Sequence, residues 1–151
     1  MRWVDKPSRS RVVVRGFEQL LVDFSVFAAT PMIGALSVLL VLAALFGYTV
    51  QFCDVSSAFL HAPLSEEVFV EPPDEWHRPL DEHGHAIDAV WRLKKAMYGL
   101  KGSPKAWQVY LAEVITIKLP FKQCKTDSQF FFSVELHVHI SVHMDLSLIH
   151  I

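Results

Sequence analysis

Cysteine is scarce in this sequence, and the two that occur, Cys53 and Cys124, lie far apart without a CxxC spacing. Their number and spacing fit a reducing compartment and exclude a structural zinc knuckle. An excess of one charge is also missing, because 14 Lys and Arg residues against 16 Asp and Glu residues give a formal net charge of -2. No global basic field therefore favours nucleic-acid binding. Charged residues make up 20% and hydrophobic residues 52%, so we expect a folded chain.

Charge is absent altogether from the stretch between positions 24 and 53. Within it, Thr30 can cap a helix and Pro31 suits the first helical position, while Gly47 suits the end. We therefore expect a helix over residues 31–46. Because this helix is apolar on all sides, we expect it to be buried.

The same stretch raises the alternative of a membrane-anchored, non-enzymatic protein with a span at about 32–50. The helix has about 16 residues and would be about 24 Å long, which is shorter than a hydrocarbon core of about 30 Å. We therefore favour the buried helix and expect no membrane partner.

Two local stretches are basic despite the acidic total. Residues 2–15 hold five Lys and Arg residues against one acid, and residues 92–105 hold five against none. A polyanion could bind to these two patches. The alternative for each is a basic face that is only solvated.

Helical and strand patterns alternate irregularly along the chain. Strands are predicted for "SRVVVRGF", "YTVQFCDV", "EEVFVEPP" and "AVWRLKKAMYGL", and a hairpin for "SQFFFSVEL" with "HVHISVHMD". Residues 74–88 are polar and are predicted to form a surface loop. A second helix is predicted to begin with Ser103 as its cap and Pro104 in its first turn. The chain lacks the βαβα alternation that would indicate a parallel sheet. We therefore expect an α+β fold with an antiparallel sheet packed on helices.

The last predicted strand carries Asp145 on its polar face, and another predicted strand ends at Asp54. If these strands pair, the two carboxylates meet at one edge of the sheet. Paired carboxylates at such an edge could hold two divalent metals for in-line phosphoryl transfer, because hard oxygen ligands suit Mg²⁺. A lone Asp on a polar face is more often solvated.

The histidines of this strand offer a zinc site as an alternative. His137, His139 and His143 share the face of Asp145, and an HxH pair can hold zinc. Residues 137 to 143 span roughly 20 Å in a strand, which is too far for one metal without a bend. We therefore expect this face to lie in solvent.

Three blocks together resemble a known family. "CDVSSAFLHAPLSEEVFVEPP", followed by "VWRLKKAMYGLKGSPKAWQ" and preceded by "SRVVVRGFEQ", closely resembles the reverse transcriptase of copia-type LTR retrotransposons. The similarity covers nearly the whole chain in the family's order. It implies polymerase fingers and a partial palm of the right-hand type, with fingers at about 1–31 and 62–100 and palm at about 32–61 and 101–145. The activity that it implies is RNA-directed DNA synthesis, with two Mg²⁺ ions.

The resemblance also assigns roles to individual residues. Asp54 and Asp145 match catalytic metal ligands, and the carbonyl of Val55 is a third expected ligand. Phe59 occupies the place of an aromatic gate against the ribose 2′-hydroxyl; ordinary core packing is the alternative. Arg11, with Arg9, matches a basic pair, and Arg11 is the candidate for the triphosphate.

The block "YGLKGSP" resembles the family's turn beside the incoming nucleotide and template. Gly99 and Gly102 would permit close approach of the backbone. Lys101 and Lys105 would contact phosphates, which position nucleic acid without reading its sequence. The implied partners are an RNA or DNA template with its primer, deoxynucleoside triphosphates and the remainder of a Pol polyprotein, in a cytoplasmic virus-like particle.

The family's final motif has two consecutive aspartates, but Leu146 follows Asp145 here. The last residues, "LSLIHI", match the translation of a transposase end sequence used in preparing sequencing libraries, so we expect residues 146–151 to be a non-native tail. Decay of the element is the alternative explanation. In either case we expect this chain to be catalytically inactive, and a nucleic-acid-binding relic without catalysis is a further possibility.

Overall fold

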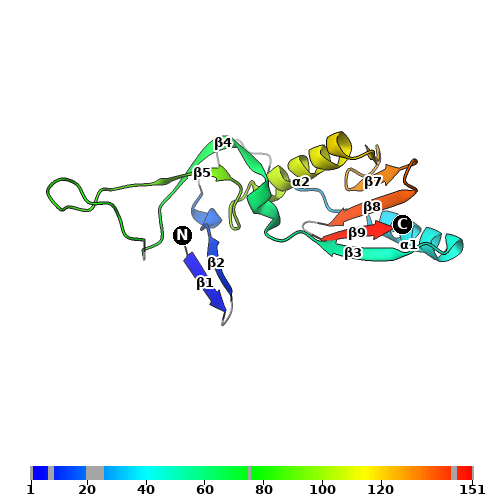
Figure 1. Cartoon of the computed structure of the whole chain (residues 1–151), viewed down its shortest axis with the longest axis horizontal. Helices are drawn as coiled ribbons and strands as arrows, with labels where there is room; N and C mark the ends of the chain where they lie inside the picture. Colours follow the sequence, from blue (N-terminus) through cyan, green and yellow to red (C-terminus); the bar gives the residue numbers. More distant parts are fainter. Residues whose placement is uncertain (1, 7–8, 20–25, 75, 144–145, 151) are drawn as a thin grey trace.

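The computed structural model of the chain describes residues 2–6, 9–19, 26–74, 76–143 and 146–150. Its fold is mixed α+β, with two α-helices and small antiparallel sheets, as expected for the class. Figure 1 shows an elongated molecule with its largest sheet at one end and a long loop at the other. Two strand pairs lie between them.

The five-stranded sheet has the order β3-β9-β8-β7-β6, and all its neighbours are antiparallel. Its strands are β3 (Val50–Asp54), β6 (Lys122–Gln123), β7 (Phe130–Ser133), β8 (Val138–His143) and β9 (Leu146–His150). The predicted hairpin is confirmed as β7 and β8. The strand that ends at Asp54 does not pair directly with β8, the strand that leads to Asp145, because β9 lies between β3 and β8.

Helix α1 (Ile33–Phe46) ends as predicted at Gly47, which adopts a left-handed conformation with φ of 67°. Its start differs from the prediction: Met32 is the N-cap residue and no side chain caps the helix. Two side chains from distant parts of the sequence hold the segment that leads into α1. The N–H of Met32 donates to Asp127 Oδ2 (3.0 Å), and the N–H of Ala29 donates to Gln108 Oε1 (2.9 Å).

The expectation that α1 is buried is wrong. Only Leu39 and Ala43 are buried, and the helix contacts β8 of the sheet. Apolar side chains such as Ile33 and Leu45 stay in solvent at 86% and 72% exposure. The helix has 14 residues, and within the described ranges no helix is long and apolar enough to cross a membrane.

Helix α2 (Ser103–Glu113) begins where the sequence predicts, with Pro104 in its first turn, and continues as a π-helical turn, η3 (Val114–Lys118). Gly102 is the N-cap residue, so the prediction of Ser103 as the cap is wrong. The buried Ser103 hydroxyl instead donates to the carbonyl of Met97 at 2.6 Å. The helix start is thereby attached to the preceding turn.

Among the described residues, buried apolar side chains form two core clusters. One joins η3 and the sheet through Ile115, Phe121, Phe131, Ile140 and Val142. The other joins α2 to the segment after β3 through Ala58, Ala62, Ala96 and Trp107. Leu111 of α2 packs against both clusters and so connects them.

The face of β8 opposite the core is less exposed than predicted. Ser141 on that face is buried at 4% exposure, whereas His143 is exposed. His137 lies outside β8, in the turn before it, with φ of 54°. The prediction that His137, His139 and His143 follow one strand face is therefore wrong for His137.

Two strand pairs form the middle of the molecule (Figure 1). Strands β1 (Arg2–Lys6) and β2 (Arg9–Val13) form one antiparallel pair, and β4 (Pro63–Val70) and β5 (Trp91–Lys95) form the other. Of these strands, only β1 was missing from the prediction. Gly16 starts a short 3-10 helix, η1 (Gly16–Glu18), that leads away from β2.

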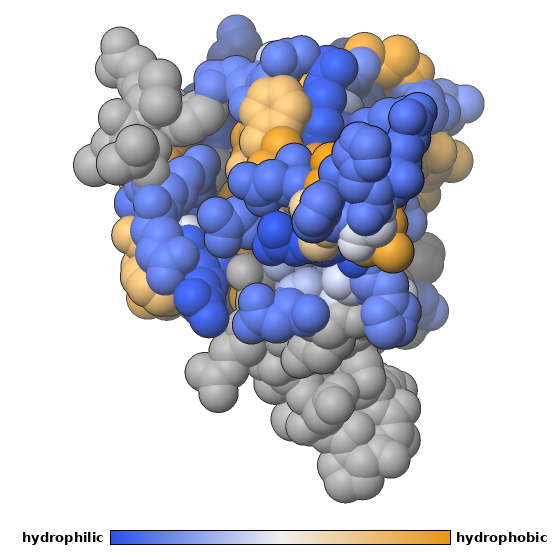
Figure 2. Space-filling view, turned by 90° about the vertical axis from the view of Figure 1, so that its left-hand side faces the viewer, coloured by the Kyte–Doolittle hydropathy of each residue, from blue (hydrophilic) through white to orange (hydrophobic). Residues whose placement is uncertain are grey.

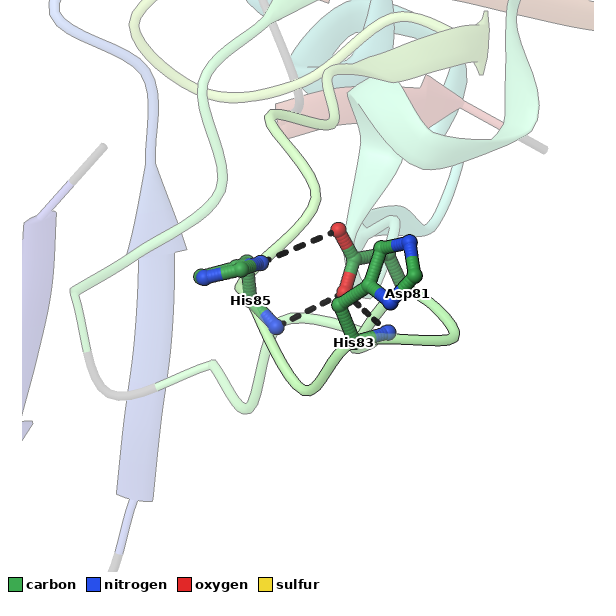
Figure 3. A network of polar contacts seen from close by, with 3 residues as sticks. All are labelled: Asp81, His83 and His85. Atoms are coloured by element: carbon green, nitrogen blue, oxygen red, sulfur yellow. Dashed lines mark hydrogen bonds and ion pairs between the residues drawn. The ribbon is translucent and has the colours of Figure 1, made fainter.

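Within residues 74–88, the positions that the structure describes form the predicted surface loop. Asp81 organises its tip, because its Oδ1 accepts hydrogen bonds from the N–H groups of His83 (2.9 Å) and His85 (2.8 Å) (Figure 3). A bridge between Leu80 and Ala86 closes the tip. Figure 2 views the molecule from the side of this loop and shows mainly hydrophilic side chains, with scattered hydrophobic ones.

Candidate functional site

Asp54 is the last residue of β3, and its side chain has an exposed position. Leu146, the first residue of β9, is the register partner of both Asp54 and His143. The end of β3 therefore lies beside the two strand ends that flank positions 144 and 145. Asp145 itself, with Met144, lies outside the described residues.

The segment after Asp54 turns sharply into the core. Val55 is half-buried, Ser57 has a positive φ of 55°, and a short 3-10 helix, η2 (Ala58–His61), follows. Within η2, Phe59 packs at the edge of the core cluster around Ala58. The sharp turn thus places an aromatic side chain a few residues beyond the strand-end carboxylate.

The ring of Phe59 contacts the ring of Tyr98, with centroids 4.9 Å apart and planes tilted by 51°. Such tilted aromatic pairs hold each other's orientation. Sequence reasoning missed Tyr98, although the residue lies directly before Gly99 in the block "YGLKGSP". The structure thereby connects two motifs that are about forty positions apart in the chain.

Gly99 permits a close contact between two backbone segments, whereas the predicted approach of Gly99 and Gly102 to a nucleotide and template stays a prediction. Its φ is 93°, and a Cβ at this position would lie 1.9 Å from the carbonyl oxygen of Val14. A Cβ at Gly16 would in turn lie 1.8 Å from the carbonyl oxygen of Gly99. The N–H of Val14 donates to the carbonyl of Tyr98 at 2.9 Å. The turn after β5 is therefore attached directly to the segment after β2.

Lys101 continues this attachment. Its ammonium donates to the carbonyl of Gln19 at 2.9 Å, and its backbone N–H donates to Gln19 Oε1 at 3.1 Å. Gln19 is a second residue that sequence reasoning missed. Because an ammonium has three donors, this bond leaves capacity for a further acceptor.

Lys105 lies in the first turn of α2 and lines a cavity of about 440 Å³ between this helix and β4. The cavity floor is mainly apolar, and Ser65, Glu66 and Tyr110 supply polar groups. Gly102 also lines it. The second predicted phosphate contact thus lies at a hollow and not on a flat surface.

The structure describes the side chains of only some of the remaining arginines in the two basic stretches. Arg11 lies on β2 opposite Val4, and Arg9 opposite Lys6; the side chains of both arginines are outside the described part of the chain. Arg92 on β5 forms an exposed ion pair with Glu67 at 2.6 Å, and Arg15 pairs with Glu18 at 3.5 Å. The basic stretches are thus partly neutralised within the chain.

A divalent metal would have hard oxygen ligands at the end of β3. The Asp54 carboxylate and the carbonyl of Val55 are oxygen donors of the kind that Mg²⁺ prefers. Among the described residues, no group of three or more His, Cys, Asp or Glu side chains is placed to hold a metal ion. Oxygen donors such as these two suit Mg²⁺ better than they suit a metal that prefers soft ligands.

Comparison with known proteins covers nearly the whole chain. The family model described as "Reverse transcriptase (RNA-dependent DNA polymerase)" matches residues 2–150. No solved structure matches the chain.

Curated relatives are Pol polyproteins of transposons. The chain is 36% identical over 101 residues (66% of its length) to the "Retrovirus-related Pol polyprotein from transposon TNT 1-94" of Nicotiana tabacum. It is 33% identical over 109 residues to that from transposon RE2 and 28% identical over 129 residues to that from transposon RE1, both of Arabidopsis thaliana; these alignments cover 68% and 82% of the chain. The matched regions span only 7% to 8% of these relatives.

Proposed function

Because this chain belongs to the reverse transcriptase (RNA-dependent DNA polymerase) family, we propose that it is the fingers and part of the palm of a copia-type retrotransposon polymerase. The similarity to copia-type Pol polyproteins that the three motif blocks indicated is confirmed. In this proposal the fingers comprise about residues 1–31 and 62–100, and the palm about 32–61 and 101–145.

The observation that carries the proposal is the position of Asp54. It ends β3 opposite Leu146, the residue that directly follows Asp145 in the chain. A carboxylate from each of two adjoining chain segments then serves one metal centre, with the Val55 carbonyl as a further ligand. Mg²⁺ at this site supplies charge stabilisation for the attacking and leaving oxygens of phosphoryl transfer.

The nucleotide binds beside Phe59. The ring of Phe59, whose centroid lies 4.9 Å from that of the Tyr98 ring, packs under the sugar and leaves no room for a 2′-hydroxyl. Arg11 contacts the triphosphate. The turn over residues 98–104 lies against the nucleotide and template, and Gly102, where an added Cβ would meet no atom of the chain within 4 Å, leaves room for close approach.

The template and primer run along the basic residues. Lys101 and Lys105 contact phosphates, with Lys101 using the donors that its bond to Gln19 leaves available. The remainder of a Pol polyprotein supplies the rest of the duplex-binding surface, in a cytoplasmic virus-like particle of the element. These assignments rest on the family and on the described contacts around the turn.

The 151-residue chain itself is inactive in this proposal. It has Leu146 where the family has the second aspartate, and loss of one transition-state contact alone costs about 3 kcal/mol, or about a hundredfold in rate.

Primer extension by the purified chain with Mg²⁺ and deoxynucleotides tests both parts of this account. We expect no extension, but salt-sensitive binding of a labelled template and primer. Binding that does not weaken with salt would contradict the nucleic-acid assignment. Extension at a rate near that of a full-length relative would contradict the inactivity.

A further inference from the structure

His61, the last residue of η2, reaches back to the turn that follows Asp54. Its Nε2 atom lies 3.1 Å from the carbonyl oxygen of Ser56. A carbonyl oxygen can only accept a hydrogen bond, so Nε2 carries a proton in this contact and donates it. The proposed function leaves this histidine without a role, although it bonds to the residue directly after the Val55 carbonyl.

The turn between β3 and η2 depends on contacts of this kind. Ser57 has a φ of 55°, a conformation that a residue with a side chain rarely adopts and that persists only where the surrounding structure holds it. The N–H of Leu60 donates to the carbonyl of Ser57 at 2.9 Å. With the His61 bond to the carbonyl of Ser56, this contact fixes the two peptide groups that follow the carbonyl of Val55.

The core determines where His61 lies. Its ring contacts that of Trp107, with centroids 6.4 Å apart and planes tilted by 46°, and Trp107 is only 3% exposed. The next residue, Ala62, is buried in the same core cluster, and its carbonyl accepts a hydrogen bond from the N–H of Ala96 at 2.9 Å. The imidazole itself has an exposed position. Its hydrogen bond therefore connects a rigid part of the core to the turn beside Asp54.

We propose that His61 is a positioning residue for the divalent-metal site, because its Nε2–H holds the turn that presents the Asp54 carboxylate and the Val55 carbonyl. This inference rests on the proposed function, since it requires a metal ion at these two ligands. Residues that orient metal ligands through hydrogen bonds commonly change the metal affinity by about ten- to a hundredfold when they are replaced. The His61 bond is exposed and acts one residue beyond the Val55 ligand, so we expect an effect at the lower end of this range.

Two substitutions of His61 separate its hydrogen bond from its bulk. His61→Leu removes the donor but keeps an apolar side chain beside Trp107. His61→Gln keeps an N–H donor that can reach the Ser56 carbonyl. In a titration with Mn²⁺ followed by electron paramagnetic resonance, the dissociation constant should rise about tenfold in His61→Leu and return close to the wild-type value in His61→Gln. His77→Leu, at an exposed histidine of the loop over residues 74–88, is the matched control and should bind like the wild type.

A second measurement needs no metal. In the metal-free chain, the nitrogen NMR signals of the His61 ring should show a proton on Nε2. The backbone amide signal of Ser57, which belongs to the peptide group that His61 holds, should shift in His61→Leu and largely return in His61→Gln. The amide signals of the core residues Ala62 and Ala96 should stay in place in both variants, which separates a change in the turn from a change in the fold.

Failure of this inference can be told apart from failure of the proposed function. If the wild-type chain binds Mn²⁺ and His61→Leu binds it equally well, or His61→Gln does not restore the affinity, the positioning role is overturned and the metal site stands. A Ser57 signal that does not move in His61→Leu would overturn the role in the same way. A wild-type chain that binds no Mn²⁺ would overturn the proposed metal site, and the positioning role with it.

Discussion

Asp127 is the buried side chain that holds the start of α1. Its two carboxylate oxygens accept hydrogen bonds from two backbone N–H groups, those of Met32 (3.0 Å) and Gln129 (2.9 Å). The same carboxylate therefore orders the turn before β7 and the N-cap residue of a helix some ninety positions earlier. Sequence reasoning assigned that helix start to Thr30 and Pro31, because local patterns cannot show an acceptor that comes from a distant segment.

Asp127→Asn should lower the free energy of unfolding by about 1–3 kcal/mol, because an amide offers one oxygen to two buried donors. Urea denaturation measures the change. Asp88→Asn is the control, since the Asp88 side chain is 97% exposed and its ion pair with Arg78 contributes at most about 1 kcal/mol. Equal effects of the two substitutions would contradict the capping role of Asp127.

Asp81 gives the loop over residues 74–88 a pH dependence. The hydrogen bond from the His85 backbone N–H, aided by that from His83, holds the pKa of Asp81 below its ordinary value of 3.8 (Figure 3). Because the pKa is lowered in the folded chain, its stabilising effect is complete above pH 3.8 and is lost as the pH falls through the lower folded value.

We expect the backbone amide NMR signals of His83 and His85 to shift together in that acidic window. Asp81→Asn should remove the shift, whereas Glu82→Gln, one position along the chain, should leave it in place. Signals that move identically in the wild type and in Asp81→Asn would argue against the loop contacts.

Local sequence signals predicted the helices and strands of this fold better than they predicted the burial and the neighbours of these elements. The glycine that ends α1, the proline at the start of α2 and the β7–β8 hairpin follow from short-range rules, and all three are confirmed. The burial of α1 was predicted wrongly, and the position of β9 beside β3 was not predicted. Both depend on contacts between distant segments, which hydrophobicity and periodicity do not encode.

The backbone contact between η1 and the turn at Gly99 gives a sharp test at the level of these elements. Gly99→Ala should lower the free energy of unfolding by about 1–3 kcal/mol or more, because the residue has positive φ and its new Cβ would meet the Val14 carbonyl.

Gly34→Ala is the matched control for this substitution. Position 34 lies within α1, and a Cβ added there would meet no other segment of the chain within 4 Å. Alanine should therefore stabilise the chain at this position by about 0.5–1 kcal/mol. Thermal denaturation of the two variants separates the outcomes. Destabilisation by Gly34→Ala as large as that by Gly99→Ala would contradict the contact.

In the whole molecule, the family suggests roles for single motif residues, whereas the structure describes the contacts between the motifs. The sequence predicted Asp54, Phe59 and the turn at Gly99 as site residues from their motifs. It did not predict that Tyr98 contacts Phe59, or that Gln19 binds Lys101. These pairings join segments that are far apart in the chain, so no single motif contains them.

The central claim is that Asp54 and Asp145 hold a divalent metal together at the end of β3. Titration of the chain with Mn²⁺, followed by electron paramagnetic resonance, tests it most directly, because Mn²⁺ accepts the same oxygen ligands as Mg²⁺. We predict one bound ion in the wild type, its loss in both Asp54→Asn and Asp145→Asn, tighter binding in Leu146→Asp, and no change in Glu135→Gln. Binding that survives Asp54→Asn or Asp145→Asn undiminished would contradict the claim.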